Sequence, residues 1–254
     1  TRIVAIANEK GGVGKTATVV NLGAALSLAG QKVLVIDMDP QHNSTNGLGI
    51  DATDDSISIY DLITNGQEYN VRDAICHTKW DKLDLIPSHI DLSGAEIELV
   101  DEEGRENRLK NVIDQIAGNY DVIIMDTPPS LSLLTINVFA AASEVMVPCQ
   151  THPYAYKALE DLFDTIEDIK EEINPDITIS GIIPTFYDQR TRISRDILER
   201  LQSDERYKDL LFATPIRANT TITASTDKGK PVVFYRKSSY GANDYMALAR
   251  EFIG

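Results

Sequence analysis

The chain has 254 residues, of which 43% are hydrophobic, so it can bury a full core and lies near the upper size of a single α/β domain. Its net charge of −15, from 24 Lys and Arg against 39 Asp and Glu, opposes long-range attraction to nucleic acid or anionic lipid, although a local basic face can still bind either. Its first residues contain no apolar leader segment and no run of 18 apolar residues occurs, so we expect a cytoplasmic protein that is neither exported nor inserted in a membrane.

Short β-branched segments alternate with helical patterns along the chain. The predicted strands cover residues 2–7, 32–37, 83–87, 121–126, 144–149 and 177–183. Their nearly continuous apolar character indicates that both faces are covered. Helices are predicted over 17–30 and 156–173, the first ended by Gly30 and the second by Asn174-Pro175. This order predicts an α/β fold with a doubly wound, mostly parallel sheet flanked by helices, organised as one domain over residues 1–254.

Residues 6–20, IANEKGGVGKTATVV, join the first predicted strand to the first predicted helix. Three glycines let the backbone curl so that several N–H groups point inward, and the N-terminus of the following helix adds its dipole. Lys15 can then reach the β- and γ-phosphates of a nucleotide, and the Thr16 hydroxyl can bind Mg²⁺. The stretch therefore predicts a phosphate-binding loop for ATP and Mg²⁺. Its predicted nucleotide-binding residues are Lys10, Gly11, Gly12, Val13, Gly14, Lys15, Thr16 and Ala17.

A second lysine, Lys10, precedes the glycines, and Glu9 stands where an ordinary phosphate-binding loop has a small residue. The stretch KGGVGKT resembles the deviant Walker A motif of the ParA/MinD superfamily, whose members are dimeric P-loop ATPases that position plasmids, chromosomes, division sites and protein cargo. The resemblance implies a homodimer with ATP sandwiched between the subunits, in which Lys10 crosses the interface and contacts the partner's ATP. The alternative interpretation of Lys10 is a solvated loop lysine.

Two later predicted strands end in aspartates. The segment VLVIDMDPQHNST, residues 33–45, resembles the second acidic segment of the superfamily, which implies that Asp37 lies near the magnesium shell and Asp39 beside the attacking water. Without the resemblance, the two aspartates could merely cap a turn. In DVIIMDTPPSLS, residues 121–132, Asp126 stands at the predicted strand tip, where a carboxylate can reach Mg²⁺ through water. The predicted catalytic residues are Lys10, Lys15 and Asp39, and the predicted metal ligands are Thr16, Asp37 and Asp126.

The resemblance to ParA/Soj-type sequences extends over most of the chain and is weakest over residues 50–115. By analogy, GIIPTFYDQRT, residues 181–191, places Thr185 near the adenine, and the segment from 214 onward brings Pro215 and Arg217 over the base. Arg190 matches one of two arginines that relatives use for DNA, and Arg217 could replace the other, which falls near Thr221. Two further basic clusters are either DNA contacts or solvated faces; they comprise Arg190, Arg192, Arg195 and Arg200, and Lys228, Lys230, Arg236 and Lys237.

The resemblance predicts a ParA/Soj-type partition ATPase with a slow basal rate of ATP hydrolysis. ATP would close the homodimer, the dimer would bind non-specific DNA, and a cargo-linked ParB-like or other adaptor protein would stimulate hydrolysis, so the protein would be associated with the nucleoid. A MinD-like membrane switch is one alternative, but it needs a basic amphipathic tail that the segment MALAREFIG does not provide, and we expect no membrane partner. A P-loop metabolic kinase is another alternative, although residues 50–115 contain no recognisable acceptor site or lid.

An iron–sulfur ATPase of the same superfamily is a further alternative, because such a protein holds its cluster through cysteines in loops near the nucleotide. Cys76 and Cys149 are far apart in the sequence and have neither CxxC spacing nor neighbouring histidine clusters. We interpret both as core thiols, which argues against a cluster, a zinc site or a disulfide framework.

Overall fold

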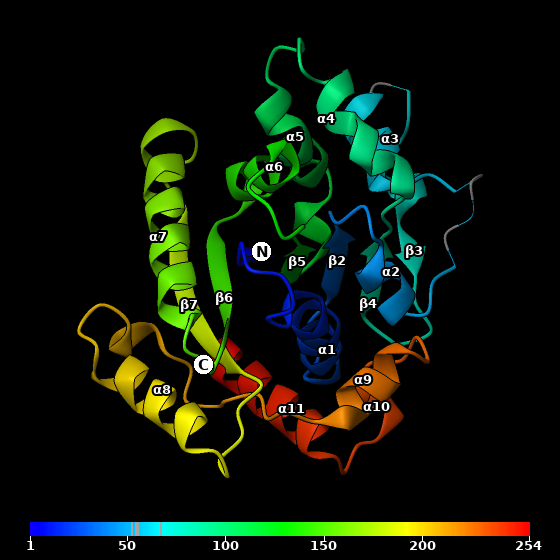
Figure 1. The fold of residues 1–254 in the computed structure, drawn as a ribbon. Helices are drawn as coiled ribbons and strands as arrows, with labels where there is room; N and C mark the ends of the chain where they lie inside the picture. The colour runs from blue at the N-terminus through cyan, green and yellow to red at the C-terminus, as the bar shows by residue number, and fades with distance from the viewer. Residues whose placement is uncertain (52, 54–55, 67) are drawn as a thin grey trace.

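The computed structural model describes residues 1–51, 53, 56–66 and 68–254, and its centre is one β-sheet (Figure 1). In the described part of the chain, seven strands are arranged in the order β3-β4-β2-β5-β1-β6-β7. All neighbouring strands are parallel except β3 and β4, which are antiparallel. The strands are β1 (Arg2–Ile6), β2 (Val33–Asp37), β3 (Cys76–His77), β4 (Leu83–Ile86), β5 (Val122–Asp126), β6 (Glu144–Gln150) and β7 (Thr178–Thr185).

Helices connect the strands and cover both faces of the sheet. The α-helices are α1 (Lys15–Leu28), α2 (Asn43–Gly47), α3 (Ile59–Thr64), α4 (Ala95–Glu98), α5 (Arg108–Asp114), α6 (Leu133–Ala141), α7 (Ala155–Glu172), α8 (Arg192–Ser203), α9 (Thr220–Thr226), α10 (Val232–Tyr235) and α11 (Tyr240–Ile253). Short 3₁₀ helices are η1 (Val71–Ala74), η2 (Ile90–Gly94), η3 (Arg105–Asn107), η4 (Ala117–Asn119) and η5 (Lys208–Leu210). Figure 1 shows α5, α6 and α7 on one side of the sheet and α1 with α11 on the other.

Burial on both faces explains why the strands are apolar throughout. In β1, Ala5 packs in the cluster that contains the α5, α6 and α7 side chains, whereas Val4 and Ile6 pack in the cluster that contains α1 and α11. Successive side chains of a strand point to opposite faces, so a strand between two helical layers needs apolar residues at every position. The parallel arrangement places the carboxyl ends of β1, β2, β5, β6 and β7 at one edge, where ligands of such sheets bind.

The predicted fold class is confirmed, as are the six predicted strands and the two predicted helices. α1 begins at Lys15, two residues before the predicted start, because the glycine loop leads directly into the helix. The sequence prediction missed β3, whose two residues are too few to produce a periodic pattern. No helix in the described ranges combines the length and the apolar character that crossing a bilayer requires.

The two cysteines differ in burial. Cys149 is 1% exposed at the end of β6, and burial raises the pKa of its thiol to about 12. Cys76 is only half-buried in the edge strand β3, where partial burial raises the pKa of its thiol. The interpretation of both as core thiols is therefore right for Cys149 and wrong for Cys76, because an edge strand has a neighbour on one side only.

Candidate functional site

The loop between β1 and α1 has a backbone that only glycine adopts easily. Gly12 and Gly14 have φ angles of 75° and 94°, in the left-handed region. Gly14 is the N-cap residue of α1 and supplies no side-chain cap, so the N–H groups of the first helical turn remain available to a ligand. A Cβ atom at Gly14 would lie 3.5 Å from the Phe186 ring, so the loop is also closely packed on its outer side.

Lys15 lies beneath this loop and stabilises its conformation. The side chain is 7% exposed, and Nζ donates a hydrogen bond to the backbone oxygen of Asn8 at 2.9 Å. Burial lowers the pKa of Lys15, whereas the nearby carboxylates of Asp126 and Asp39 raise it. A buried ammonium facing the interior of an N–H-lined loop is placed to compensate phosphate charge.

Lys10 lies on the outer rim of the same loop. Its backbone N–H donates to the Asn8 side-chain oxygen at 2.9 Å, which fixes the loop, while its side chain is half-buried near Cys149. Within the described residues, no carboxylate forms an ion pair with the Lys10 ammonium group. The ammonium group of Lys10 is therefore available to a negatively charged group other than those of the described residues.

Asp37 and Asp126 lie side by side at the ends of β2 and β5, where they are register partners. Both are fully buried. Asp37 Oδ2 accepts hydrogen bonds from the backbone N–H and the hydroxyl of Thr45, each at 2.8 Å, and Asp126 Oδ2 accepts one from Ser44 Oγ at 2.7 Å. Burial raises the pKa of both carboxyl groups, and the repulsion between the two carboxylates raises the pKa of Asp126 further.

The residues around Asp126 fit a magnesium ion. Asp126 Oδ1 is buried and has no hydrogen-bond partner among the residues that the structure describes, and the Thr16 hydroxyl is near enough to lower the pKa of the Asp126 carboxyl group. In the same residues, no group of three or more His, Cys, Asp or Glu side chains is arranged to hold a metal. Mg²⁺ bound with a nucleotide requires few protein ligands, because waters and phosphate oxygens complete its octahedral shell.

Asp39 borders an open cleft in front of the loop. Its side chain is 8% exposed, and its Oδ1 accepts a hydrogen bond from the Gln41 backbone N–H at 2.9 Å. The cleft has a volume of about 410 Å³, and its lining includes the loop glycines, Lys15, Thr16, Gln41, Asn43, Pro129 and Phe186. A carboxylate fixed at the edge of a phosphate cleft can accept a hydrogen bond from water.

A second cavity, of about 300 Å³, adjoins this cleft and is lined mostly by apolar atoms. The two share Gly14, Thr16, Ala17, Asn43 and Phe186. The second cavity adds Thr185, Ile216, Arg217, Ala218, Asn219, Ile222, Thr223, Thr226 and Tyr245, whereas Pro215 does not line it. An apolar slot beside a phosphate-binding loop fits a planar nucleotide base.

Thr185 connects this cavity to the loop, because its hydroxyl donates to the backbone oxygen of Val13 at 2.8 Å. We expect Thr185→Val to weaken ATP binding about fivefold, since one hydrogen bond that fixes the loop contributes ~1 kcal/mol. Isothermal titration calorimetry with ATP and Mg²⁺ measures this effect. Thr178→Val, at the other end of β7, is the matched control because the Thr178 hydroxyl contacts Ser143 and not the loop. Equal affinities of both variants and the wild type would contradict this role of Thr185.

The two arginines predicted to contact DNA both have acidic partners. Arg190 is exposed and pairs with Asp188 in the loop after β7. Arg217 is partly buried beside the base-sized cavity, pairs with Asp244, and stacks over the Tyr240 ring at 4.2 Å. Thr221, near which the second DNA-contacting arginine of relatives falls, lies in the first turn of α9.

Several residues of the site were not predicted from the sequence. Asn8, Ser44 and Thr45 fix Lys15 and the two buried aspartates through hydrogen bonds. Phe186, which has a φ angle of 51°, lines both cavities, and Tyr245 lines the second cavity from α11. One local sequence signal for these residues is the run Asn-Ser-Thr at positions 43–45, which follows Asp39. Ser and Thr hydroxyl groups in such turns commonly hydrogen-bond to nearby groups.

A glycine loop, a buried lysine and a strand-tip aspartate at the carboxyl edge of a parallel sheet define a P-loop nucleotide-binding protein. Residues 1–179 match the family model described as an AAA domain, so the chain belongs to this ATPase family. It is 42% identical over 250 residues to the sporulation initiation inhibitor protein Soj of Bacillus subtilis, covering 98% of this chain and 97% of Soj. The chain is thus a member of the Soj/ParA family.

The chain is also similar to two further proteins. The chromosome partitioning protein ParA of Caulobacter vibrioides is 40% identical over 254 residues, which cover 99% of this chain and 94% of ParA. The structure of cobyrinic acid a,c-diamide synthase from Mycobacterium smegmatis with bound ADP and magnesium is similar with a TM-score of 0.85 and 36% identity, covering 100% of this chain and 94% of that chain.

Proposed function

We propose that this chain is an ATP hydrolase that dimerises around ATP and Mg²⁺ and positions or segregates a cargo such as a plasmid, a chromosome or a protein compartment. The observation that carries this proposal is Lys10, a cation on the rim of the phosphate-binding loop with no acidic partner among the described residues. Two facing triphosphates repel each other, and a cation about 4 Å from a phosphate oxygen contributes ~4 kcal/mol at an effective dielectric constant near 20. Lys10 therefore makes dimerisation depend on bound nucleotide.

The residues of the site divide the work of hydrolysis. The loop N–H groups and Lys15 bind the phosphates, and Thr185 holds the loop in shape. Thr16, Asp37 and Asp126 would hold the magnesium ion, which would supply charge neutralisation at the phosphates. Asp39 orients the attacking water and accepts its proton. The basal rate of ATP hydrolysis is slow, because rapid hydrolysis would dissociate the ATP-bound dimer before a partner protein acts on it.

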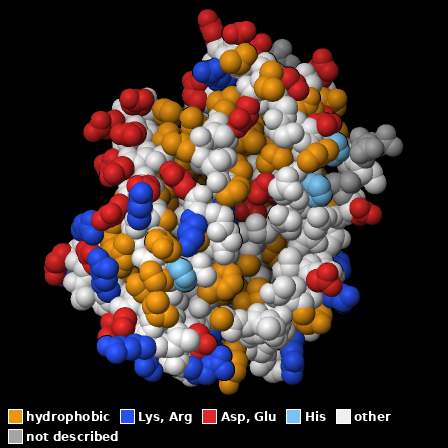
Figure 2. Space-filling model, in the orientation of Figure 1, with side chains coloured by type: hydrophobic (Ala, Val, Ile, Leu, Met, Phe, Trp, Pro, Cys, Tyr) orange, Lys and Arg blue, Asp and Glu red, His pale blue; other side chains and the backbone are white. Residues whose placement is uncertain are grey.

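Charge is unequally distributed along the chain, which supports non-specific DNA as a partner in spite of the acidic total. Residues 181–254 contain 12 of the 24 Lys and Arg but only 9 of the 39 Asp and Glu, so this part carries +3 and residues 1–180 carry −18. Figure 2 shows Asp and Glu gathered over α7 and the α4–α5 end, with Lys and Arg concentrated toward α8 and the C-terminal helices. A basic surface of this kind attracts the DNA backbone, whereas the acidic part attracts a basic segment of an adaptor protein.

Residues 1–254 act as one domain in this proposal, and the protein works in the cytoplasm, where it binds the nucleoid.

Light scattering should detect a dimer with ATP and Mg²⁺ and a monomer with ADP. Inorganic phosphate should be released without an added acceptor, whereas phosphate transfer only to an added small molecule would indicate a kinase.

DNA binding by the ATP-bound dimer should weaken with salt. The plot of log K against log salt concentration should have a slope of about −0.9 for each DNA phosphate that the protein neutralises. Binding to anionic vesicles in place of DNA would indicate a membrane switch.

A further inference from the structure

The loop between β7 and α8 pairs Arg190 with its own neighbour, Asp188. Nε and an Nη atom of Arg190 each lie 2.9 Å from a different oxygen of the Asp188 carboxylate, and the Arg190 backbone N–H donates to the same carboxylate at 3.0 Å. These hydrogen bonds from Arg190 lower the pKa of Asp188 to about 2. The Arg190 side chain is 84% exposed, so the ion pair lies on the protein surface.

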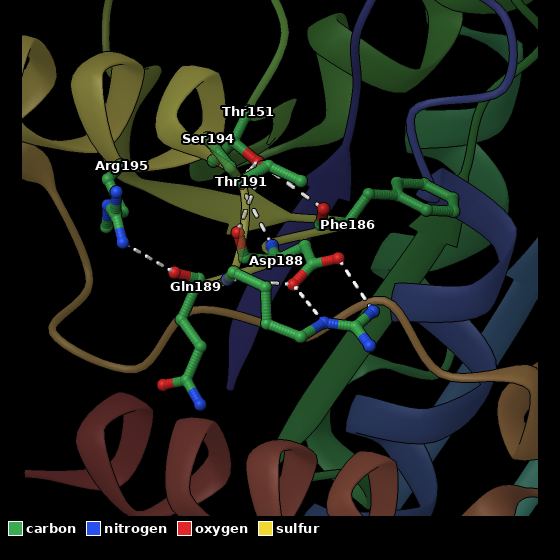
Figure 3. Close-up of polar contacts among 8 residues, drawn as sticks. Thr151, Phe186, Asp188, Gln189, Thr191, Ser194 and Arg195 are labelled. Atoms are coloured by element: carbon green, nitrogen blue, oxygen red, sulfur yellow. Dashed lines mark hydrogen bonds and ion pairs between the residues drawn. The ribbon is translucent and has the colours of Figure 1, made fainter.

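A buried hydroxyl pair fixes the position of Asp188. Its backbone N–H donates to Ser194 Oγ at 3.1 Å, and Ser194 Oγ lies 2.6 Å from Thr151 Oγ1 in a buried contact (Figure 3). The backbone N–H and the hydroxyl of Thr191 both donate to the Asp188 carbonyl oxygen, at 3.0 and 3.1 Å. These hydrogen bonds fix the backbone of Asp188 in the turn, which keeps its carboxylate next to Arg190.

The other arginines of this surface have weaker or uncharged partners. Arg192 lies 3.4 Å from Asp196, Arg195 donates to the Gln189 carbonyl oxygen at 3.2 Å, and Arg200 stacks over Tyr156. Arg190 alone among these four is engaged by a carboxylate through two parallel N–H···O bonds. This is the same fork by which a guanidinium group binds a phosphate, so a DNA phosphate and Asp188 require the same donors.

We propose that Asp188 sets the affinity of the dimer for DNA by competing with DNA phosphates for Arg190. The proposal rests on the proposed function, because it requires that the ATP-bound dimer binds DNA. An exposed ion pair is weak enough for a phosphate to displace it, and its removal favours the free guanidinium group by up to about fivefold. Two such arginines in a dimer give a gain in DNA affinity of up to about 25-fold.

Asp188→Asn tests the competition directly, because Asn keeps an oxygen for the Arg190 backbone N–H and removes the charge. We expect Asp188→Asn to bind a labelled random-sequence DNA duplex at least about threefold more tightly than the wild type, each with a non-hydrolysable ATP analogue and Mg²⁺, by fluorescence anisotropy. Arg190→Ala should bind more weakly than the wild type. The double variant Asp188→Asn/Arg190→Ala should match Arg190→Ala, because Asp188 then has no arginine to release.

Asp204→Asn is the matched control for the added positive charge. Asp204 holds Arg206 in the same arrangement, with the Arg206 backbone N–H at 3.0 Å and two side-chain nitrogens at 3.2 Å, but Arg206 also pairs with Glu160. This variant changes the net charge equally and leaves Arg206 paired, so its DNA affinity should equal that of the wild type. Thermal unfolding of every variant shows whether the turn is preserved, and Asp188→Ser provides a second uncharged variant.

The outcomes separate the two proposals. If the wild type binds DNA but Asp188→Asn and Asp188→Ser bind no more tightly than Asp204→Asn, the competition proposal is wrong and the proposed function stands. A gain that persists in Asp188→Asn/Arg190→Ala likewise overturns the competition, because it would reflect charge alone. If neither the wild type nor Asp188→Asn binds DNA with the ATP analogue at low salt, the DNA-binding part of the proposed function fails.

Discussion

Asp39→Ala is expected to lower the rate of ATP hydrolysis by about 100- to 10,000-fold, the range typical for loss of a general base. Asp39 borders the cleft in front of the loop and is held by the Gln41 backbone N–H. The variant leaves unchanged the loop N–H groups and Lys15, to which we assign phosphate binding. ATP affinity should therefore be retained, and the variant should accumulate as an ATP-bound dimer. Phosphate release under single-turnover conditions and ATP titration measure the two effects separately.

Asp39→Asn separates the charge from the local fold, because its side-chain oxygen can still accept the hydrogen bond from Gln41. It should be as slow as Asp39→Ala if the carboxylate acts on water. Asp114→Ala removes an exposed carboxylate of α5 that pairs with Lys110, and it should hydrolyse ATP like the wild type. Wild-type rates in both Asp39 variants would show that this carboxylate has no part in hydrolysis.

Lys10→Ala is expected to abolish the ATP-dependent dimer. Each dimer loses two contacts between an ammonium group and the partner's ATP. Because one such contact is worth ~4 kcal/mol at an effective dielectric constant near 20, the dimer dissociation constant should rise more than about 100-fold. ATP should still bind the monomer, since Lys15 keeps its hydrogen bond to the Asn8 carbonyl oxygen. Sedimentation velocity with ATP and Mg²⁺ measures the dimer, and nucleotide titration measures the monomer.

Lys110→Ala is the matched control for this change, because Lys110 is an exposed lysine of α5 with a local partner, Asp114. It should dimerise with ATP like the wild type. Two results would refute the role given to Lys10, namely a wild type that stays monomeric with ATP and Mg²⁺ or a Lys10→Ala variant that dimerises as strongly as the wild type.

The phosphate-binding loop could be predicted because its chemistry is local. Gly12, Gly14 and Lys15 stand within four positions, and their function depends on backbone conformations that glycine alone adopts easily and on one helix N-terminus. The sequence pattern also predicted the strands, since continuous apolar runs of five to eight residues between helical patterns are typical of a sheet covered on both faces. The catalytic role of Asp39 is a prediction that the variants above test, and the magnesium-binding roles of Asp37 and Asp126 stay predictions.

The base-sized cavity could not be assembled in the same way. Thr185 hydrogen-bonds to Val13 from 172 positions away, and Tyr245 reaches the cavity from α11. Pro215 was predicted beside the base from sequence similarity, but Ile216 and Arg217 line the cavity and Pro215 does not. The four consecutive residues from Ile216 to Asn219 all line the cavity, so the contact begins one residue after Pro215. An alignment that identifies the segment does not identify the residue at which this contact begins.

The sequence by itself determined the fold class, the phosphate-binding loop and the family, because these depend on hydrophobic periodicity and on a contiguous motif. Only the tertiary structure decided that Asp37 and Asp126 are buried neighbours, since the parallel register of β2 and β5 brings them together. It alone also decided that Arg190 is paired with Asp188 while Lys10 has no acidic partner in the described chain. Whether a charged side chain is free or paired depends on distances of a few ångströms, which sequence spacing does not fix.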